Sequence, residues 1–586
     1  MTNIHNRVTE LTSLLGDGAS MAVSIADSWD SQKNDRREWE DQKLELRKYI
    51  TAIDTSTTSN KTLPWKNSTT IPKLTQLRDN LHANYMGALF PNDEWLRWEG
   101  YNKDDETGKK RAAIQAYMGN KTREGHFRST MSQLVLDYID YGIAIADVAF
   151  VNENKEDELT GETIPGYVGP KLLRISPHDH VFDGTASSYR KAPKISRYIK
   201  SLGELKADLN NQKGDEWILD SLAKAEELRS QASRFGLDDF HKLEGFRVDG
   251  FQNMYDYLQS GLVEVLEFEG DFYDSTTGEY FPDHIITILD RRYVARKVPN
   301  PSWLHGGTKY MVGWRNRPDN LYGMGPLDNL VGMQYRLDHL ENLKADAMDL
   351  AVYPPVAVKG DVEDFVWQPM EVVEMGEDGE IGELGKNLQG VIAAQTEMNN
   401  LMNLMEEMAG APKQAMGIRT PGEKTAFEVQ SLENAAGRIF QSKVTKFEIE
   451  LLEPVLNAML EVARRNLEGS DVARVLDNDL GVVDFLTITK EDITARGHVR
   501  PIGARHFAAR AQLVQNLTGL SNTPIWQQVS AHISSKQLAV LVEDVMNLGR
   551  YELFAPNQGV VEQVETQRLV QEASTQLQEE AITPIE

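Results

Sequence analysis

The sequence predicts an α+β protein that is mainly helical. Stretches with apolar residues every three to four positions alternate with shorter runs rich in β-branched and aromatic residues. The 586 residues allow about four folding units at ~150 residues each. The shares of hydrophobic (40%) and charged (26%) residues are those of an ordinary globular protein.

Charge and cysteine content exclude several classes of function. The chain has no cysteine, which excludes disulfides, thiolate metal sites and cysteine nucleophiles and fits a reducing compartment. With 62 basic and 89 acidic residues the net charge is −27, whereas proteins that wrap nucleic acid are basic. An acidic surface could let DNA slide past, or could simply maintain solubility. Neither a signal peptide nor an apolar stretch of ~18 residues is expected.

The N-terminal region predicts two helical segments. Residues 19–53 are highly charged, with Trp29 and Trp39 among them, and indicate an exposed helix anchored by a few aromatic side chains. A second helix is expected over 73–89, where Phe90-Pro91 ends the pattern. Its apolar stripe consists of Leu74, Leu77, Leu81, Tyr85 and Leu89.

A mixed helix and strand region follows, up to about residue 320. One helix is expected over 111–140 and strands over 142–151 and 171–176. Residues 262–298 resemble a hairpin with its turn at 275–278. The polar stretch between these strands predicts helix or irregular structure.

Two long helices separated by an insert are predicted next, over 325–350 and 389–409. Their apolar residues recur at the 3–4 spacing of helices that pack lengthwise on neighbours. These seam residues are Leu330, Met333, Leu337, Leu340, Met398, Leu401 and Met405. The insert, 351–388, has nine acids and two bases, and its runs 355–359 and 370–374 favour strands.

A loop over 410–424 carries Lys413, Arg419 and Lys424 against a single acid, Glu423. A capping-box spacing then opens a long helix at about residue 425.

In that long helix Leu432, Ile439, Phe440, Phe447, Leu451 and Leu452 are expected to face inward. Pro454 is expected to kink it. A loop is predicted over 468–490 and a strand or extended arm over 498–505. Helices follow to about residue 550, and an acidic tail begins at 556.

Catalytic and metal-binding patterns are incomplete. Residues 417–425 approach a phosphate-binding loop, but Glu423 is inserted between Gly422 and Lys424 and the preceding element is helical. His178 and His180 supply too few ligands for a closed metal site and favour a structural role. We therefore expect no catalytic residue, cofactor or metal, and no enzymatic activity.

Several short strings occur in an order that resembles one family. They are PWKN (64–67), NLHANY (80–85), LFPND (89–93), SP (176–177), VFD (181–183), YPP (353–355) and KTAFE (424–428). Together with the helix–insert–helix–loop–helix layout, they make the chain resemble the portal proteins (head-to-tail connectors) of short-tailed bacteriophages. The likeness covers most of the length.

The resemblance implies a portal fold assembled as a ring of about twelve subunits at one capsid vertex. It implies the following regions: wing 1–324, stem helices 325–350 and 389–409, clip 351–388, tunnel loop 410–424, long kinked helix and return to the wing 425–497, crown 498–555 and acidic C-terminal tail 556–586.

The resemblance also implies roles for particular residues. In the tunnel loop Lys413, Gln414, Arg419 and Lys424 would face DNA, and the alternative is that these are solvated side chains without DNA contact. The candidate clip contacts with a tail adaptor are Trp367, Glu371, Glu374, Glu377, Asp378 and Glu380. The seam residues would hold neighbouring stem helices together.

The implied function is structural. The ring would pass double-stranded DNA during packaging and ejection, without sequence-specific binding. It would dock the terminase motor and later the tail adaptor, and contact the major capsid and scaffolding proteins. It would be made in the bacterial host cytoplasm and reside in the virion. The alternatives are a helical scaffold or adaptor without a channel and, less favoured because no intact phosphate loop is present, a packaging ATPase.

Overall fold

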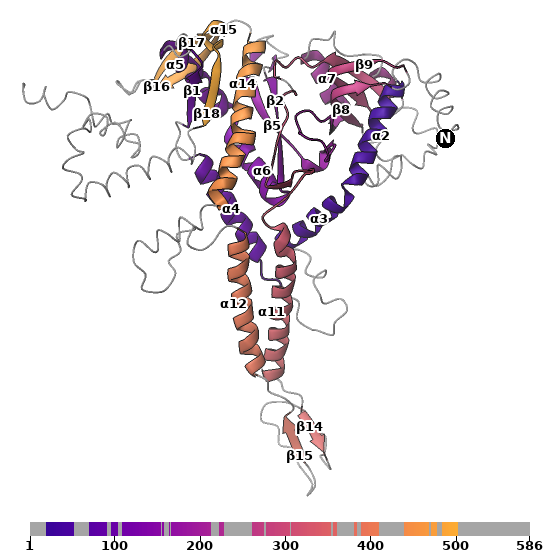
Figure 1. The fold of residues 1–586 in the computed structure, drawn as a ribbon, viewed down its shortest axis with the longest axis vertical. Helices are drawn as coiled ribbons and strands as arrows, with labels where there is room; N and C mark the ends of the chain where they lie inside the picture. Colours follow the sequence, from indigo (N-terminus) through magenta and orange to yellow (C-terminus); the bar gives the residue numbers. More distant parts are fainter. Residues whose placement is uncertain are drawn as a thin grey trace, which may run out of the picture. The chain divides into compact units, whose positions relative to one another are not determined.

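The computed structural model in Figure 1 describes residues 19–51, 69–90, 95–102, 108–153, 155–156, 163–164, 166–211, 222–227, 261–274, 277–304, 306–352, 356–359, 380–383, 388–409, 439–467, 470–476 and 483–501. Helices take the larger share and all the pairings given for the strands are antiparallel, which confirms the α+β class. The chain divides into a larger unit (1–89, 96–471 and 487–501) and a smaller one (90–95, 472–486 and 502–586). Apart from parts of β16 (Ser470–Leu476) and β17 (Val483–Thr489), the described helices and strands belong to the larger unit.

The main sheet has five strands in the order β10-β9-β8-β7-β6. Their bounds are β6 His180–Phe182, β7 Lys194–Ser201, β8 Leu262–Tyr273, β9 Tyr280–Leu289 and β10 Tyr293–Pro299. Side chains alternate between two clusters: Leu266 joins one, whereas its neighbour Val265 joins the other. The second cluster also includes Leu205 from α7 (Leu202–Asn211).

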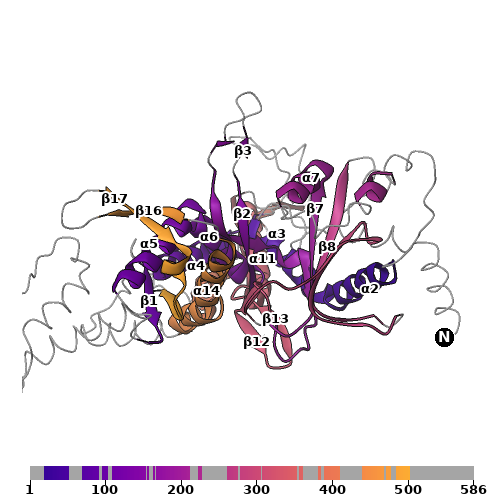
Figure 2. The ribbon, with the colours of Figure 1, turned by 90° about the horizontal axis from the view of Figure 1, so that it is seen from above.

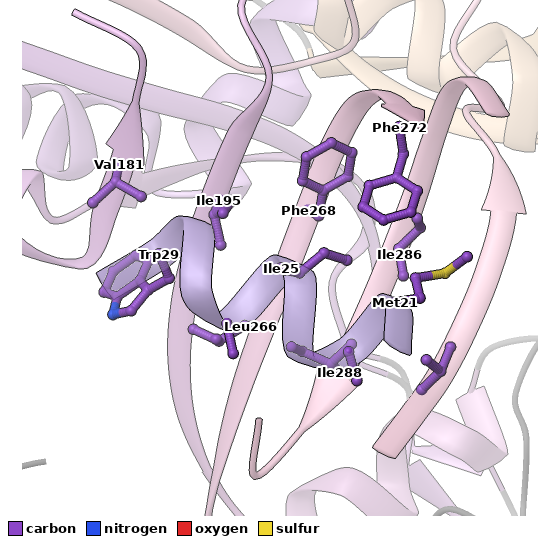
Figure 3. Close-up of a cluster of buried hydrophobic side chains, with 13 residues drawn as sticks. Met21, Ile25, Trp29, Val181, Ile195, Leu266, Phe268, Phe272, Ile286 and Ile288 are labelled. Atoms are coloured by element: carbon purple, nitrogen blue, oxygen red, sulfur yellow. The ribbon is translucent and has the colours of Figure 1, made fainter. Parts of the chain in front are cut away.

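Helix α2 (Ala19–Asp35) covers one face of this sheet, as Figures 2 and 3 show. Met21, Ile25 and Trp29 lie against sheet residues that include Leu266 and Ile288. Helix within 19–53 and an anchoring aromatic residue, Trp29, are thus confirmed, but the expected exposure was wrong, because one face of α2 is buried. The high charge of this segment concealed a narrow apolar stripe at i, i+4 and i+8, which is sufficient to bury one helix face.

Residues 262–298 form three strands rather than a two-armed hairpin. The extra turn occurs at Asp290 (φ 49°) and Arg291 (φ 60°), in the left-handed region. Arg291 is buried and bonds to Glu264 (Nε–Oε2 2.7 Å) and to Asp30 on α2 (Nη1–Oδ1 2.8 Å). These ion pairs hold the turn against the sheet, and sequence spacing alone did not indicate them.

A three-stranded sheet, β11-β2-β5, packs with helices α6 (Phe127–Asp140) and α14 (Glu453–Asn466). Strands β2 (Ile143–Asn152) and β5 (Val168–Ile175) confirm the two predicted strands. The third is β11, Tyr310–Gly313. Gly142 (φ 73°) precedes β2, and its Cα lies so close to the backbone of 323–325 that no side chain would fit.

The helix expected over 111–140 is two helices, α5 (Gly108–Glu124) and α6. The break is at Gly125 and at His126, whose φ of 53° cannot continue a right-handed helix. Helix α4 (Lys73–Leu89) has the predicted bounds, and its whole apolar stripe is buried. Helix α3 (Arg37–Thr51) follows α2, and Arg36 between them donates to the carbonyl oxygens of residues 177, 178 and 180.

The long helix changes geometry close to Pro454. A helical stretch that begins at Ile439 is separated from α14 by a π-helical turn, Glu448–Leu452. Pro454 lies in the first turn of α14. Phe447, Leu451 and Leu452 are buried as predicted, whereas Ile439 is exposed. The predicted loop over 468–490 was wrong, because the strand pair β16 (Ser470–Leu476) and β17 (Val483–Thr489), much of it in the smaller unit, occupies it.

The remaining elements are short. Strand β18 (Gly497–Pro501), expected as a strand or arm, pairs with β1 (Leu96–Gly100). The others are β3 Lys155–Glu156, β4 Thr163–Ile164, η2 Pro177–Asp179, β12 Arg315–Arg317, β13 Asn320–Met324 and α15 Lys490–Ile493.

Candidate functional site: the helical hairpin

Two long helices pack against each other as an antiparallel hairpin, α11 (Val331–Val352) and α12 (Leu388–Met408). Both predicted helices are thus observed, with α11 preceded by a short 3₁₀ turn, Asp328–Leu330. Asp328 fixes this start: its Oδ2 accepts the backbone N–H of Gly325 (2.7 Å) and pairs with Lys43 of α3. Figure 1 shows α11 and α12 side by side, with strands β14 and β15 beyond their far ends.

Most of the predicted seam residues are buried within a single subunit. Leu330, Leu337, Leu340, Met398 and Met405 are buried, and Met333 and Leu401 are half-buried. A single chain suffices to bury the first five. The structure thus shows contacts of these residues within one chain, and the contact between neighbouring subunits that the resemblance implied for them stays a prediction.

A polar ladder along α11 holds an extended segment that precedes α4. Gln334, Asp338 and Asn342, four residues apart, lie on one face and are all buried. Asp338 Oδ1 accepts the N–H of Ile71 (3.0 Å), and Gln334 Nε2 donates to the Ile71 carbonyl (2.6 Å). Asn342 Oδ1 accepts the N–H of Thr69 (2.7 Å). The ladder pairs backbone groups outside regular structure, which would otherwise be costly to bury.

Asp338 is the one acidic residue of the ladder, and its burial is unfavourable when the carboxyl is charged. Burial raises the pKa of Asp338 to about 6, although the hydrogen bonds from Ile71 and Gln334 lower it. Asp338 Oδ2 accepts no hydrogen bond, and no ion pair reaches this carboxylate from the residues that the structure describes. By contrast, Lys73 of α4 and Glu406 of α12 form a buried pair at 2.5 Å (Nζ–Oε1) that ties the second helix to the body.

Six large apolar side chains of the hairpin are exposed. They are Tyr335, Met348 and Val352 on α11 and Ile392, Leu404 and Met408 on α12. Val352 is 70% and Ile392 68% exposed. Met348 and Val352, four residues apart, lie on one face of α11, as Leu404 and Met408 do on α12, and exposed apolar side chains that share a face suit contact with another molecule. Met408 continues the 3–4 spacing of Met398, Leu401 and Met405, whereas the other five fall outside the positions that marked the seam.

The tip of the hairpin contains a two-stranded pair, β14 (Val356–Lys359) and β15 (Glu380–Glu383). Strand β14 confirms the predicted run 355–359, and Lys359 lies opposite Glu380 in the register. Of the six candidate clip contacts only Glu380 is among the described residues. The predicted run 370–374 and the other five, Trp367, Glu371, Glu374, Glu377 and Asp378, lie outside them.

The candidate tunnel-loop residues Lys413, Gln414, Arg419 and Lys424 also lie outside the described residues, as does Leu432. The structure therefore leaves their DNA contact as a prediction.

His180 has a structural role. His180 is buried in β6, and its two ring nitrogens lie 2.9 Å from Ser196 Oγ and 2.9 Å from Tyr189 OH. Burial lowers the pKa of His180 well below its usual value, and the nearby cations Lys309 and Lys194 add to this effect. Both nitrogens are thus engaged within the protein, which leaves none for a metal. Among the described residues, no cluster of three or more His, Asp or Glu side chains could hold an ion.

A buried charge cluster lies between β8 and the start of β11. Lys309 Nζ lies 2.7 Å from Glu267 Oε1 and 3.2 Å from Glu269 Oε2, and its side chain is 2% exposed. Burial lowers the pKa of Lys309, but the two carboxylates outweigh it and hold that pKa well above its usual value. Lys309 faces two carboxylates, and Lys194 is a second cation close to Glu269, so this cluster is a structural clamp between strands.

No protein-family model matches the sequence, and no curated protein is similar to it. Within the helices that the structure describes, none combines the length and apolar character needed to cross a membrane.

Proposed function

We propose that this protein is a viral portal subunit that assembles into a closed ring through which double-stranded DNA passes. The observation that carries the proposal is the set of six exposed apolar side chains on the α11–α12 hairpin. A subunit that uses one face against a different face of its neighbour forms a closed ring when the rotation closes. A hairpin with apolar side chains on both helices suits such a contact, and its acidic insert would then lie at one end of the ring.

The remaining parts of the proposal follow the resemblance. The body would be the wing, the hairpin the stem, and the β14–β15 tip part of the clip, which would meet the terminase and later the tail adaptor. The capsid and scaffolding proteins would surround the ring in the virion. The protein itself would catalyse nothing, and its loop 410–424 would touch DNA without reading sequence. Deleting 412–422 should then leave rings intact but impair DNA packaging or retention.

Electron microscopy of single particles tests the ring directly. We expect a closed ring of about twelve subunits with an axial hole. Filaments, or compact oligomers without a hole, would instead support a scaffold or adaptor, and ATP hydrolysis by the pure chain would support a motor subunit.

A double variant tests which surface closes the ring. Met348→Asp with Ile392→Asp places two charges on the exposed apolar surface and leaves the buried seam intact. Each side chain contributes about 1.5–3 kcal/mol when fully buried, so the loss at every interface should dissolve the ring into subunits. Asn400→Asp, an exposed change on α12, is the control and should assemble normally. Normal rings from the double variant would show that another surface makes the contact.

A further inference from the structure

A cavity of about 410 Å³ lies among α3, α4, α6 and β5, remote in sequence from the hairpin. Its volume falls within the ~300–1,000 Å³ typical of ligand sites. Four basic side chains line it, Lys43, Arg47, Arg78 and Arg174, against two acids, Asp137 and Asp140. Three of these cations are paired, Arg78 and Arg174 with the two acids and Lys43 with Asp328. Arg47 is thus the lining cation without a carboxylate partner among the described residues.

Two side-on ion pairs build part of its wall. Arg78 donates from Nε and Nη2 to the two oxygens of Asp140 (2.7 Å each). Arg174 donates in the same way to Asp137 (2.5 and 2.7 Å). These pairs fix both guanidinium groups in place.

Each pair leaves the Nη1 group of its arginine outside the bidentate contact. Arg174 Nη1 has no hydrogen-bond partner among the described residues. Arg78 Nη1 approaches only Asp79, at 3.8 Å. The cavity is thus lined by two oriented cations with donors to spare.

The mouth and the remaining walls differ in character. Arg47 is exposed and lines the cavity, which places a third guanidinium where a ligand would enter. Leu46, Ile50 and Leu136 supply aliphatic walls. The site therefore combines guanidinium donors, which match the geometry of carboxylates, with apolar surface for an attached hydrocarbon.

We propose that this cavity binds an acidic peptide segment of a partner protein, with a carboxylate facing Arg47, Arg78 and Arg174 and an aliphatic side chain against Leu136. Charge complementarity selects an acidic partner. A nucleic acid fits less well, because its continuous phosphate backbone would gain nothing from the aliphatic walls. This inference does not rest on the proposed portal function.

Fluorescence anisotropy with the full-length protein tests the site. The probe is a labelled twelve-residue peptide of alternating glutamate and leucine, and a second peptide has serine in place of leucine. The variant is Arg47→Glu and the matched control is Lys48→Glu. Both residues are exposed and adjacent on α3, and the two substitutions change charge equally, but only Arg47 lines the cavity.

We expect saturable binding of the glutamate–leucine peptide that Arg47→Glu weakens about tenfold and Lys48→Glu less than about twofold. The serine peptide should bind about tenfold more weakly than the leucine peptide. Absence of saturable binding, or equal weakening by both substitutions, would overturn the proposal. So would displacement of the peptide by inorganic phosphate or a DNA oligonucleotide at equal or lower concentration, since either result would identify a phosphate site instead.

Discussion

Replacing Asp338 with asparagine should tighten the attachment of residues 69–71 to α11 at neutral pH. Asparagine keeps the oxygen that accepts the Ile71 N–H and the Gln334 amide. It replaces the second carboxylate oxygen, which accepts no hydrogen bond from the described residues, with a neutral NH₂ group. The substitution thus removes a buried charge without removing the hydrogen bonds that hold the segment.

The magnitude follows from the pKa of Asp338, which is 3.8 ordinarily and about 6 in the folded protein. A carboxyl whose pKa is raised on folding stabilises the fold while it is protonated. That stability is complete below pH 3.8 and is lost as the pH rises to about 6. At 1.36 kcal/mol per pH unit, the whole change is about 3 kcal/mol at most, of which about 1.4 kcal/mol falls above pH 5. Solvent screening reduces the latter to roughly 1 kcal/mol, or about fivefold in an opening equilibrium.

Hydrogen–deuterium exchange of a peptide containing Ile71 measures this effect. The two proteins are compared with each other at pH 5 and again at pH 7.5, so the intrinsic pH dependence of exchange cancels. The ratio of the wild-type exchange rate to the variant rate should rise about fivefold between the two pH values. Asp349→Asn, an exposed change on the same helix, should leave the ratio constant. A ratio for Asp338→Asn that is the same at both pH values would refute the reasoning.

Three further substitutions have defined outcomes. Gly142→Ala should lower stability by more than about 2 kcal/mol, because the added Cβ would lie 2.4 Å from Gly325 N. Gly119→Ala, within α5 and with open space around it, should be neutral or stabilising, and thermal unfolding compares the two variants. His126→Gly should raise the free energy of unfolding by up to about 1 kcal/mol in a denaturant titration, because glycine adopts the φ of 53° without strain. A lower free energy of unfolding would contradict this account. Lys309→Met leaves buried Glu269 and half-buried Glu267 without their cation and should cost about 3–5 kcal/mol, whereas exposed Lys191→Met should cost little. Equal melting temperatures for the two variants would be inconsistent with a structural clamp.

The sequence predicted long periodic elements well and interruptions poorly. The stripe of α4 and the two hairpin helices were evident because apolar residues recur every three to four positions over several turns. The break at His126 and the turn at Asp290 were missed, because both residues adopt left-handed backbone angles that surrounding contacts impose rather than their own preferences.

The candidate site shows the same limit. Periodicity identified Leu337 and Met405 as packing residues but could not say what they pack against, since contact within a chain and contact between chains use the same spacing. The burial of Gln334, Asp338 and Asn342 could not be predicted, because polar residues on a helix ordinarily indicate a face exposed to solvent. Its partner is an extended backbone more than 250 residues away, and no local pattern records such a pairing.

Strand β1 cannot pair with β18 until about 400 further residues have been synthesised. Trp98 of β1 is fully buried opposite Val499, about 400 residues further along the sequence. A ribosome adding 5–20 residues per second needs roughly 20–80 s to make that interval. For all of that time the first strand has an open edge and the tryptophan lacks its cover, so a nascent chain of this protein offers a binding site for chaperones that the finished molecule no longer has.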